Sequence, residues 1–119
     1  MGLLGGMQFL MLGISGALLA FLKAGDHLLM VVSAYEPTRA LCDKVLAGYG
    51  ITTTYYDPQI GAAIATLIKP NTKVIFLESP GSLTFEMQDI PAIAAVAKQH
   101  NIVTILDNTW ASPILCQPF

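Results

Sequence analysis

The stretch KVIFLESPGSLTFEMQDIPAIAAVAKQHNIVTILD, residues 73–107, decides the fold because it predicts a strand, a helix and a second strand in succession. KVIFLES (73–79) is a short apolar run of the kind found in buried strands. IPAIAAVAKQHN (90–101) is an alanine-rich helical segment, and IVTILD (102–107) is rich in β-branched and apolar residues. A strand, a helix and a strand in this order are typical of two parallel strands joined by a crossover helix.

The preceding segments repeat the same alternation. The helix predicted at 36–50 starts with Pro37 in its first turn and ends at Gly48 and Gly50. The near-continuous apolar strands indicate burial on both faces of a sheet. We therefore predict an α/β fold, a three-layer α/β/α domain with a mostly parallel sheet. Its other elements are strands at 27–33 (HLLMVVS) and 51–56 (ITTTYY), and a turn with a short helix at 57–69 (DPQIGAAIATLIK).

Composition limits what the chain can do. With 119 residues it forms one domain at most, and only 12% of its residues are charged, roughly half the usual fraction. A formal charge of −2 and the lack of any Lys/Arg cluster argue against nucleic-acid binding. Cys42 and Cys116 have neither CxxC spacing nor a neighbouring histidine, so we expect packing cysteines and no metal site.

The first 22 residues carry no charge, and at about 1.5 Å per residue they are long enough to span a bilayer. A signal peptide would begin with a positive segment, and none precedes the apolar run. The glycines and the polar groups of Gln8 and Ser15 argue mildly against a membrane helix. The excess of apolar residues fits either a membrane segment or a piece of a larger body. Because the α/β pattern covers most of the chain, we favour the second interpretation and predict no membrane association.

Polar and aromatic side chains follow each predicted strand. In open α/β sheets, ligands bind outside the carboxyl ends of the strands, so together these residues favour a site. Each one alone is equally typical of a cap or a turn. The phosphate-binding patterns GxGxxG and GxxxxGK[ST] and the nucleophile pattern GxSxG do not occur. His27 and His100 lie at element ends, where we expect surface residues. The strand-end residues are Ser33, Tyr35, Asp57, Glu78, Ser79, Asp107, Asn108 and Thr109.

Several motifs carry a resemblance to a known family. AGDHLLM, SAYEPTRALCDKVLAGYGITTTYYDPQIGA, PNTKVIFLESPGSLTFEMQDIPAI and ILDNTWASPIL resemble the large domain of the pyridoxal-phosphate-dependent Cys/Met-metabolism enzymes. AYEP, YYDP and ESPGS are more similar to the cystathionine β-lyase branch than to the γ-lyase or γ-synthase branches. The resemblance covers about residues 14 to 119. It implies part of the large domain of the aspartate-aminotransferase type of fold (fold type I), with pyridoxal 5'-phosphate as cofactor.

The same resemblance implies roles for individual residues. Asp107 matches the aspartate that pairs with the pyridine nitrogen, and a carboxylate there keeps that nitrogen protonated. Tyr35 matches the tyrosine that stacks on the cofactor ring. Thr109 and Trp110 are expected beside the ring. Glu78 and Ser82 are weaker candidates for the pocket lining, and Cys42, Arg39 and Tyr56 are expected to be structural.

The implied reaction is β-elimination of L-cystathionine to L-homocysteine, pyruvate and ammonia, a step of methionine biosynthesis by a cytoplasmic homotetramer. The family's Schiff-base lysine belongs to a motif like SATKY, and none of Lys23, Lys44, Lys69, Lys73 and Lys98 has a matching context. We therefore nominate no catalytic residue. The family's Gly-containing phosphate turn is likewise not reproduced in GGMQFLMLGISG.

These departures lead to the expectation of a fragment. Residues 1–13 would form an atypical apolar segment and 14–119 a partial cofactor-binding large domain, inactive when isolated. Two alternatives stay open. One is a non-catalytic remnant that associates with a homologous subunit, and the other is a small membrane-anchored protein.

Overall fold

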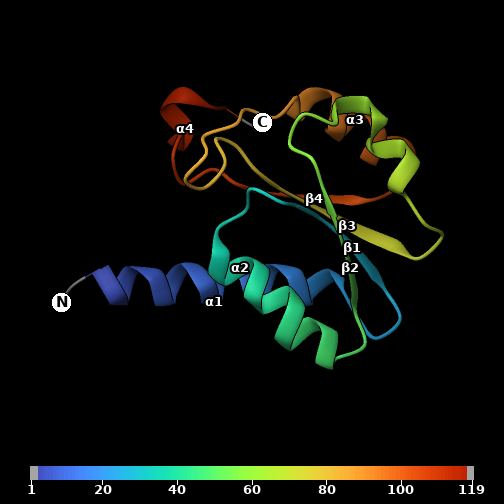
Figure 1. Cartoon of the computed structure of the whole chain (residues 1–119), viewed down its shortest axis with the longest axis horizontal. Coiled ribbons are helices and arrows are strands. Elements are labelled where there is room, and N and C mark those ends of the chain that lie inside the picture. The colour runs from blue at the N-terminus through green and yellow to red at the C-terminus, as the bar shows by residue number, and fades with distance from the viewer. Residues whose placement is uncertain (1–2, 118–119) are drawn as a thin grey trace.

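The computed structural model describes the backbone of residues 3–117, and the side chains of residues 10–117 apart from Pro113. Four strands alternate with helical segments along the chain, as the sequence predicted (Figure 1). The elements are α1 (Leu3–Phe21), β1 (His27–Val31), α2 (Glu36–Ala40), the π-helical η1 (Leu41–Leu46), β2 (Thr52–Tyr56), the 3-10 helix η2 (Gly61–Leu67), β3 (Thr72–Glu78), α3 (Ile90–Gln99), β4 (Val103–Asp107) and α4 (Ser112–Leu115).

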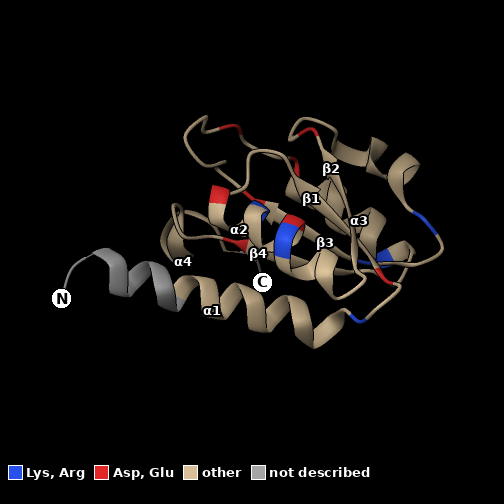
Figure 2. Ribbon diagram, turned by 60° about the horizontal axis from the view of Figure 1, so that its bottom comes forward, with Lys and Arg blue, Asp and Glu red and all other residues tan. Residues whose placement is uncertain are grey.

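The strands form one parallel sheet in the order β2-β1-β3-β4. Helices α1 and α2 lie on one side of this sheet and α3 on the other, where it packs against η2 (Figure 1). The arrangement confirms the predicted three layers. Charged residues are sparse on the ribbon and absent from the coloured part of α1 (Figure 2).

The core lies where the sequence is most apolar. All five residues of β1 are buried, and so are six of the seven residues of β3, because both strands are covered by helices on each face. The two outer strands are only partly buried, and three of the five residues of β2 are threonines. As a result the central strands are fixed by packing, and their carboxyl ends provide a rigid edge for a site.

The segment predicted as a single helix at 36–50 is divided. Helix α2 passes directly into the π-helical η1, and helical backbone continues to Gly48. The chain then turns at Gly50, whose φ of 76° suits a residue without a side chain. The predicted glycine stop is therefore confirmed, whereas the change of helix type was not foreseen.

The prediction of a surface position for His27 is wrong, while His100 is exposed as expected. The His27 ring is fully buried, with Nδ1 2.8 Å from Thr72 Oγ1 and Nε2 2.8 Å from Thr54 Oγ1. Burial, and then the charge of Lys69, lower the pKa of His27. Its partners come from the two strands that flank β1, so the histidine joins three neighbouring strands of the sheet.

Within the part of the chain that the structure describes, no helix has the length and apolar character needed to cross a membrane. The boundary predicted after residue 13 falls inside α1, which is continuous from Leu3 to Phe21. The side chains of residues 1–9 lie outside the description, so the prediction of an atypical segment there is not tested.

Candidate functional site

Asp107 is the last residue of β4, and its carboxylate has two different surroundings. One oxygen, Oδ1, accepts a hydrogen bond from the Thr109 backbone N–H at 3.0 Å and another from the Thr109 hydroxyl. This is the local turn that an aspartate favours two residues before a free N–H. The turn interpretation of Asp107 is therefore correct for one oxygen.

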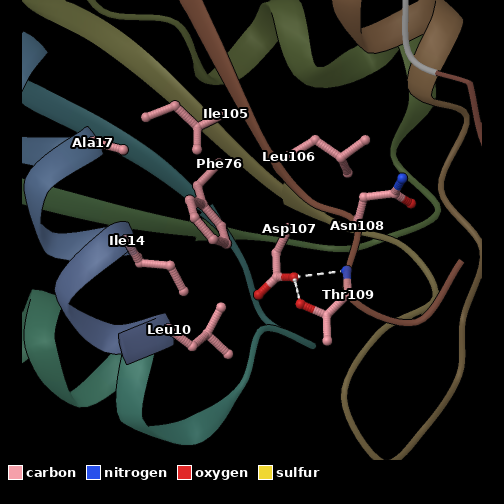
Figure 3. A pocket seen from close by; sticks show the side chains of 10 residues that line it. Leu10, Ile14, Ala17, Phe76, Ile105, Leu106, Asp107, Asn108 and Thr109 are labelled. Carbon is pink, nitrogen blue, oxygen red and sulfur yellow. Dashed lines mark hydrogen bonds between the residues drawn. The ribbon is translucent and has the colours of Figure 1, made fainter. Parts of the chain in front are cut away.

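The other oxygen of Asp107 points away from Thr109, toward side chains of α1 (Figure 3). There a cavity of about 410 Å³ lies between α1 and the sheet. Its walls are mostly apolar and include Leu10, Ile14 and Phe76, while Asp107 stands at its polar end. A carboxylate oxygen at the edge of an apolar cavity can accept a hydrogen bond from a flat ligand that fills the cavity.

Tyr35 lies immediately before α2 and is half-buried. Its backbone N–H donates to Glu78 Oε2 at 2.8 Å, which ties the end of β1 to the end of β3. The Tyr35 side chain lines a second cavity of about 270 Å³, together with Ser33 and Ser82. The structure thus places Thr109 beside Asp107 but places Tyr35 in a different cavity, where only its backbone N–H is tied to Glu78.

Glu78, a weaker candidate from the sequence, is a central residue of this edge of the sheet. It is 3% exposed and lies opposite Asp107 in the register of β3 and β4. Burial raises the pKa of Glu78 to about 7; the Tyr35 N–H opposes this rise, and the negative charge of Asp107 adds to it. The shift follows from placing one buried carboxyl group beside another carboxylate.

Other strand-end residues have structural roles. Asp57 is exposed and accepts a hydrogen bond from the Gln59 N–H at 2.7 Å, so it is a turn residue. The Ser79 hydroxyl accepts one from the Gln88 N–H. Trp110 is 58% exposed and packs edge-on against Phe85, with ring centroids 5.2 Å apart. Phe85 was not predicted at the site, because its loop shows no regular pattern.

The fold defines a class of protein first: an α/β domain with a parallel sheet that carries polar groups at the carboxyl ends of its strands, where ligands bind in open sheets of this kind. The sequence model of the family described as Cys/Met metabolism PLP-dependent enzyme matches residues 10–119. The chain belongs to this family, which confirms the resemblance found in its motifs.

Two relatives and one solved structure illustrate the similarity. The chain is 66% identical over 101 residues to a candidate cystathionine β-lyase of Saccharomyces cerevisiae, a match that covers 85% of this chain and 30% of the yeast protein. It is 52% identical over 104 residues to the cystathionine β-lyase of Haemophilus influenzae, covering 86% of this chain and 26% of that one. The crystal structure of a candidate O-acetylhomoserine (thiol)-lyase of Campylobacter jejuni, with N'-pyridoxyl-lysine-5'-monophosphate, matches with a TM-score of 0.85 and 34% identity, over 92% of this chain and 27% of that chain.

These comparisons confirm the fold and cofactor class. The structural likeness identifies the sheet as part of the large domain of a fold type I enzyme, and the family depends on pyridoxal phosphate. The chain spans less than a third of the length of the relatives described. Because these relatives are named for different activities, the similarity establishes the family rather than one reaction.

The described residues fit one end of this cofactor. The cavity-facing oxygen of Asp107 suits a protonated ring nitrogen, and the apolar walls suit a flat ring. The phosphate end has no comparable partner, since the described lining of the cavity includes neither lysine nor arginine. Gly13 and its neighbours are inside α1, where their N–H groups are used within the helix.

Proposed function

We propose that this chain forms the ring-nitrogen side of a pyridoxal-phosphate site in a cytoplasmic carbon–sulfur lyase. The observation that carries the proposal is the Asp107 carboxylate, which has one oxygen held by Thr109 and the other directed into the cavity. The substrate would be a small amino acid, L-cystathionine. With one water molecule it would give L-homocysteine, pyruvate and ammonia by β-elimination, as the cystathionine β-lyase names of the relatives suggest.

The cofactor, when bound, would supply an electron sink for the carbanion formed at the substrate Cα. The chain's own residues would keep that sink effective. Asp107 would hold a proton on the ring nitrogen, and Thr109 would keep the carboxylate in place. Tyr35, which lines the neighbouring cavity, would contribute its aromatic ring from the backbone position that Glu78 fixes. These assignments for Tyr35, Asp107 and Thr109 remain proposals.

The isolated 119 residues should have negligible activity. None of the lysines lies in the lining of the cavity, so no described amine is placed to bond the cofactor covalently. To test this, purified chain is incubated with pyridoxal phosphate and L-cystathionine, and pyruvate is measured by a coupled dehydrogenase assay. We expect no pyruvate above a heat-denatured control, and appreciable turnover would contradict the prediction.

The cofactor site needs a separate test. Pyridoxamine 5'-phosphate is the better probe because it has the same ring and phosphate but no aldehyde to react with surface lysines. Trp110 is the only tryptophan of the chain and is three residues from Asp107, so its fluorescence reports on binding. We expect weak, saturable quenching, with the Kd raised about tenfold or more in Asp107→Asn, which is about 1.4 kcal/mol of binding free energy.

Asp57→Asn is the matched control for this experiment. Asp57 follows β2, whose carboxyl end lies at the same edge of the sheet but two strands away from β4. It makes the same kind of turn bond, to the Gln59 N–H, but it does not line the cavity. It should bind the probe like the unmodified chain. Equal effects of the two substitutions, or none from Asp107→Asn, would overturn the proposed site.

A second candidate function is association with a homologous subunit without catalysis. It is favoured by large apolar side chains exposed near the C-terminal edge: Leu83 is 87% exposed, Ile114 84% and Leu115 82%. Large exposed apolar side chains are typical of surfaces that contact another chain. Co-expression with an intact family member, followed by size-exclusion chromatography, would show co-elution if this function is correct. Separate elution would exclude it, and would not affect the cofactor proposal.

A further inference from the structure

We propose that Glu78 is a positioning residue of the candidate site: its buried carboxyl group fixes the backbone that carries Tyr35 and is coupled to the charge of Asp107. This inference rests on the proposed cofactor site and deepens it. It makes one group responsible for two features of the site, the placement of the aromatic residue and the charge at the ring nitrogen. The two connections rest on different observations.

The first connection is the hydrogen bond of 2.8 Å from the Tyr35 N–H to Glu78 Oε2. Tyr35 precedes α2 with φ of −50° and ψ of 132°, and its side chain makes no cap hydrogen bond to the helix. Its own N–H is therefore anchored to β3 rather than to the helix that follows. Because Glu78 is almost fully buried at the end of a buried strand, this anchor is rigid.

The second connection follows from the sheet register. Glu78 and Asp107 are partners on adjacent parallel strands, as are Phe76 and Ile105 two residues earlier. Side chains at partner positions point to the same face of a sheet, and the Phe76, Ile105 and Asp107 side chains all border the cavity beside α1. The Glu78 and Asp107 side chains therefore lie on the same face of the sheet, on adjacent strands. The raised pKa of Glu78, due mainly to burial and in part to Asp107, agrees with this placement.

The other ionisable groups around Glu78 leave Asp107 as the main partner. The described part of α1 has none. The flanking loops contribute the Tyr35 phenol and the Glu86 carboxylate, which accepts a hydrogen bond from Thr84. Glu36, in the first turn of α2, is exposed. On α2, the Arg39 guanidinium donates to the Val32 carbonyl and lies over the Tyr55 ring.

The coupling has a direct consequence for ligand binding. A cation held at Asp107 offsets the negative charge that disfavours ionisation of Glu78. Glu78 then releases its proton to solvent more readily. Binding of a protonated ring nitrogen at Asp107 should thus be accompanied by partial proton release from Glu78 below neutral pH.

The first experiment follows the Glu78 carboxyl carbon by NMR during a pH titration of the full chain without cofactor. We expect a midpoint near pH 7 in the unmodified chain and a lower midpoint in Asp107→Asn, because the neighbouring charge has been removed. Asp57→Asn, at the same sheet edge, should leave the midpoint unchanged. A Glu78 midpoint that is the same in Asp107→Asn and the unmodified chain would overturn the coupling.

The second experiment measures hydrogen exchange of the Tyr35 amide. Glu78→Gln keeps an oxygen that can accept this bond and should preserve the protection, whereas Glu78→Ala should exchange at least about tenfold faster because the acceptor is lost. Glu86→Gln, in the neighbouring loop, should match the unmodified chain. Equal protection in Glu78→Ala and the unmodified chain would overturn the anchoring role. Should Glu78→Ala fail to fold, the Asp107→Asn titration still decides the proposal.

Neither experiment uses the cofactor, so failure of this inference is distinguishable from failure of the proposed function. If Asp107→Asn shifts the Glu78 midpoint but does not weaken pyridoxamine phosphate binding, the proposed function fails and the coupling stands. If it weakens binding without shifting the midpoint, the coupling fails and the proposed function stands. Where both hold, the pH dependence of binding between pH 5 and pH 8 should be reduced in Glu78→Gln.

Discussion

Glu78 and Asp107 are register partners at the carboxyl ends of β3 and β4, and Glu78 is the buried member of the pair. Two acidic groups at one position of a sheet interact unfavourably when both are ionised. The burial of Glu78 determines that it holds its proton to a higher pH than an exposed glutamate. The negative charge can then be carried by Asp107, which borders the cavity.

The first prediction concerns stability and pH. In the folded chain the pKa of Glu78 is about 7, against 4.5 for an ordinary glutamate, so between these values the unfolded chain loses its proton and the folded chain keeps it. The contribution of Glu78 to the free energy of unfolding should therefore be largest below pH 4.5 and should decrease as the pH rises to 7. Glu78→Gln should remove this loss, a gain at pH 7 of at most about 3 kcal/mol. Urea unfolding at several pH values measures the free energy of unfolding. If this free energy changed with pH in the same way in the unmodified chain and in Glu78→Gln, the assignment to Glu78 would be contradicted.

The second prediction is that His27 makes the free energy of unfolding depend on pH in the opposite direction. Its pKa is lowered in the folded chain, so the unfolded chain takes up a proton first as pH falls below about 6.5. Stability from this group is complete above that pH and decreases below it. His27→Ala should cost about 2–4 kcal/mol at neutral pH, because it leaves a cavity and removes the bonds to Thr72 and Thr54. His100→Ala, on the surface, should stay within about 0.5 kcal/mol of the unmodified chain in thermal or urea unfolding.

Gly81 should not tolerate a side chain. A Cβ at this position would lie 2.6 Å from Ser33 Oγ and 2.7 Å from Ser33 Cβ, so Gly81→Ala should destabilise the chain by about 1–3 kcal/mol. Ser33→Gly removes both atoms, and the double variant should recover most of the loss. Gly48→Ala, where nothing lies within 4 Å, is the control. Additive losses in the double-mutant cycle would show that this contact is not the cause.

The role of the Thr109 hydroxyl can be tested while the backbone turn at Asp107 is kept. Thr109→Val removes the hydroxyl that donates to Asp107 Oδ1 but keeps the backbone N–H of the turn. We expect a loss of stability of up to about 1 kcal/mol, since one exposed hydrogen bond is lost. Thr66→Val, which removes a similar exposed bond to the Ala63 carbonyl, should behave alike in urea unfolding. The probe affinity should fall only in Thr109→Val, and an equal affinity in both variants would exclude a role for the hydroxyl.

Much of the fold could be predicted from local patterns, because each buried strand is a compact apolar run and several turns contain glycine, proline or aspartate. The bounds of β1 and β3 differed from prediction by one or two residues: β1 ends at Val31 rather than at residue 33, and β3 runs over residues 72–78 rather than 73–79. His27 was misplaced because its partners, Thr54 and Thr72, come from strands distant in the sequence.

The contacts of the candidate site likewise divide into local ones, which the sequence indicates, and long-range ones, which it does not. The turn bond between Asp107 and Thr109 is local, and the spacing of the two residues indicates it. The bond between Tyr35 and Glu78 joins residues 43 apart, and only the strand order brings them together. The contact of Phe85 with Trp110 likewise depends on how two irregular loops fold over the sheet edge.

The divided carboxylate of Asp107 also bears on how such a chain would change over generations. One oxygen holds the turn after β4, and that task is independent of any chemistry. Selection for correct folding alone would therefore keep an aspartate at this position, even in a gene copy whose product no longer catalysed a reaction. The cavity-facing oxygen would be inherited together with the turn.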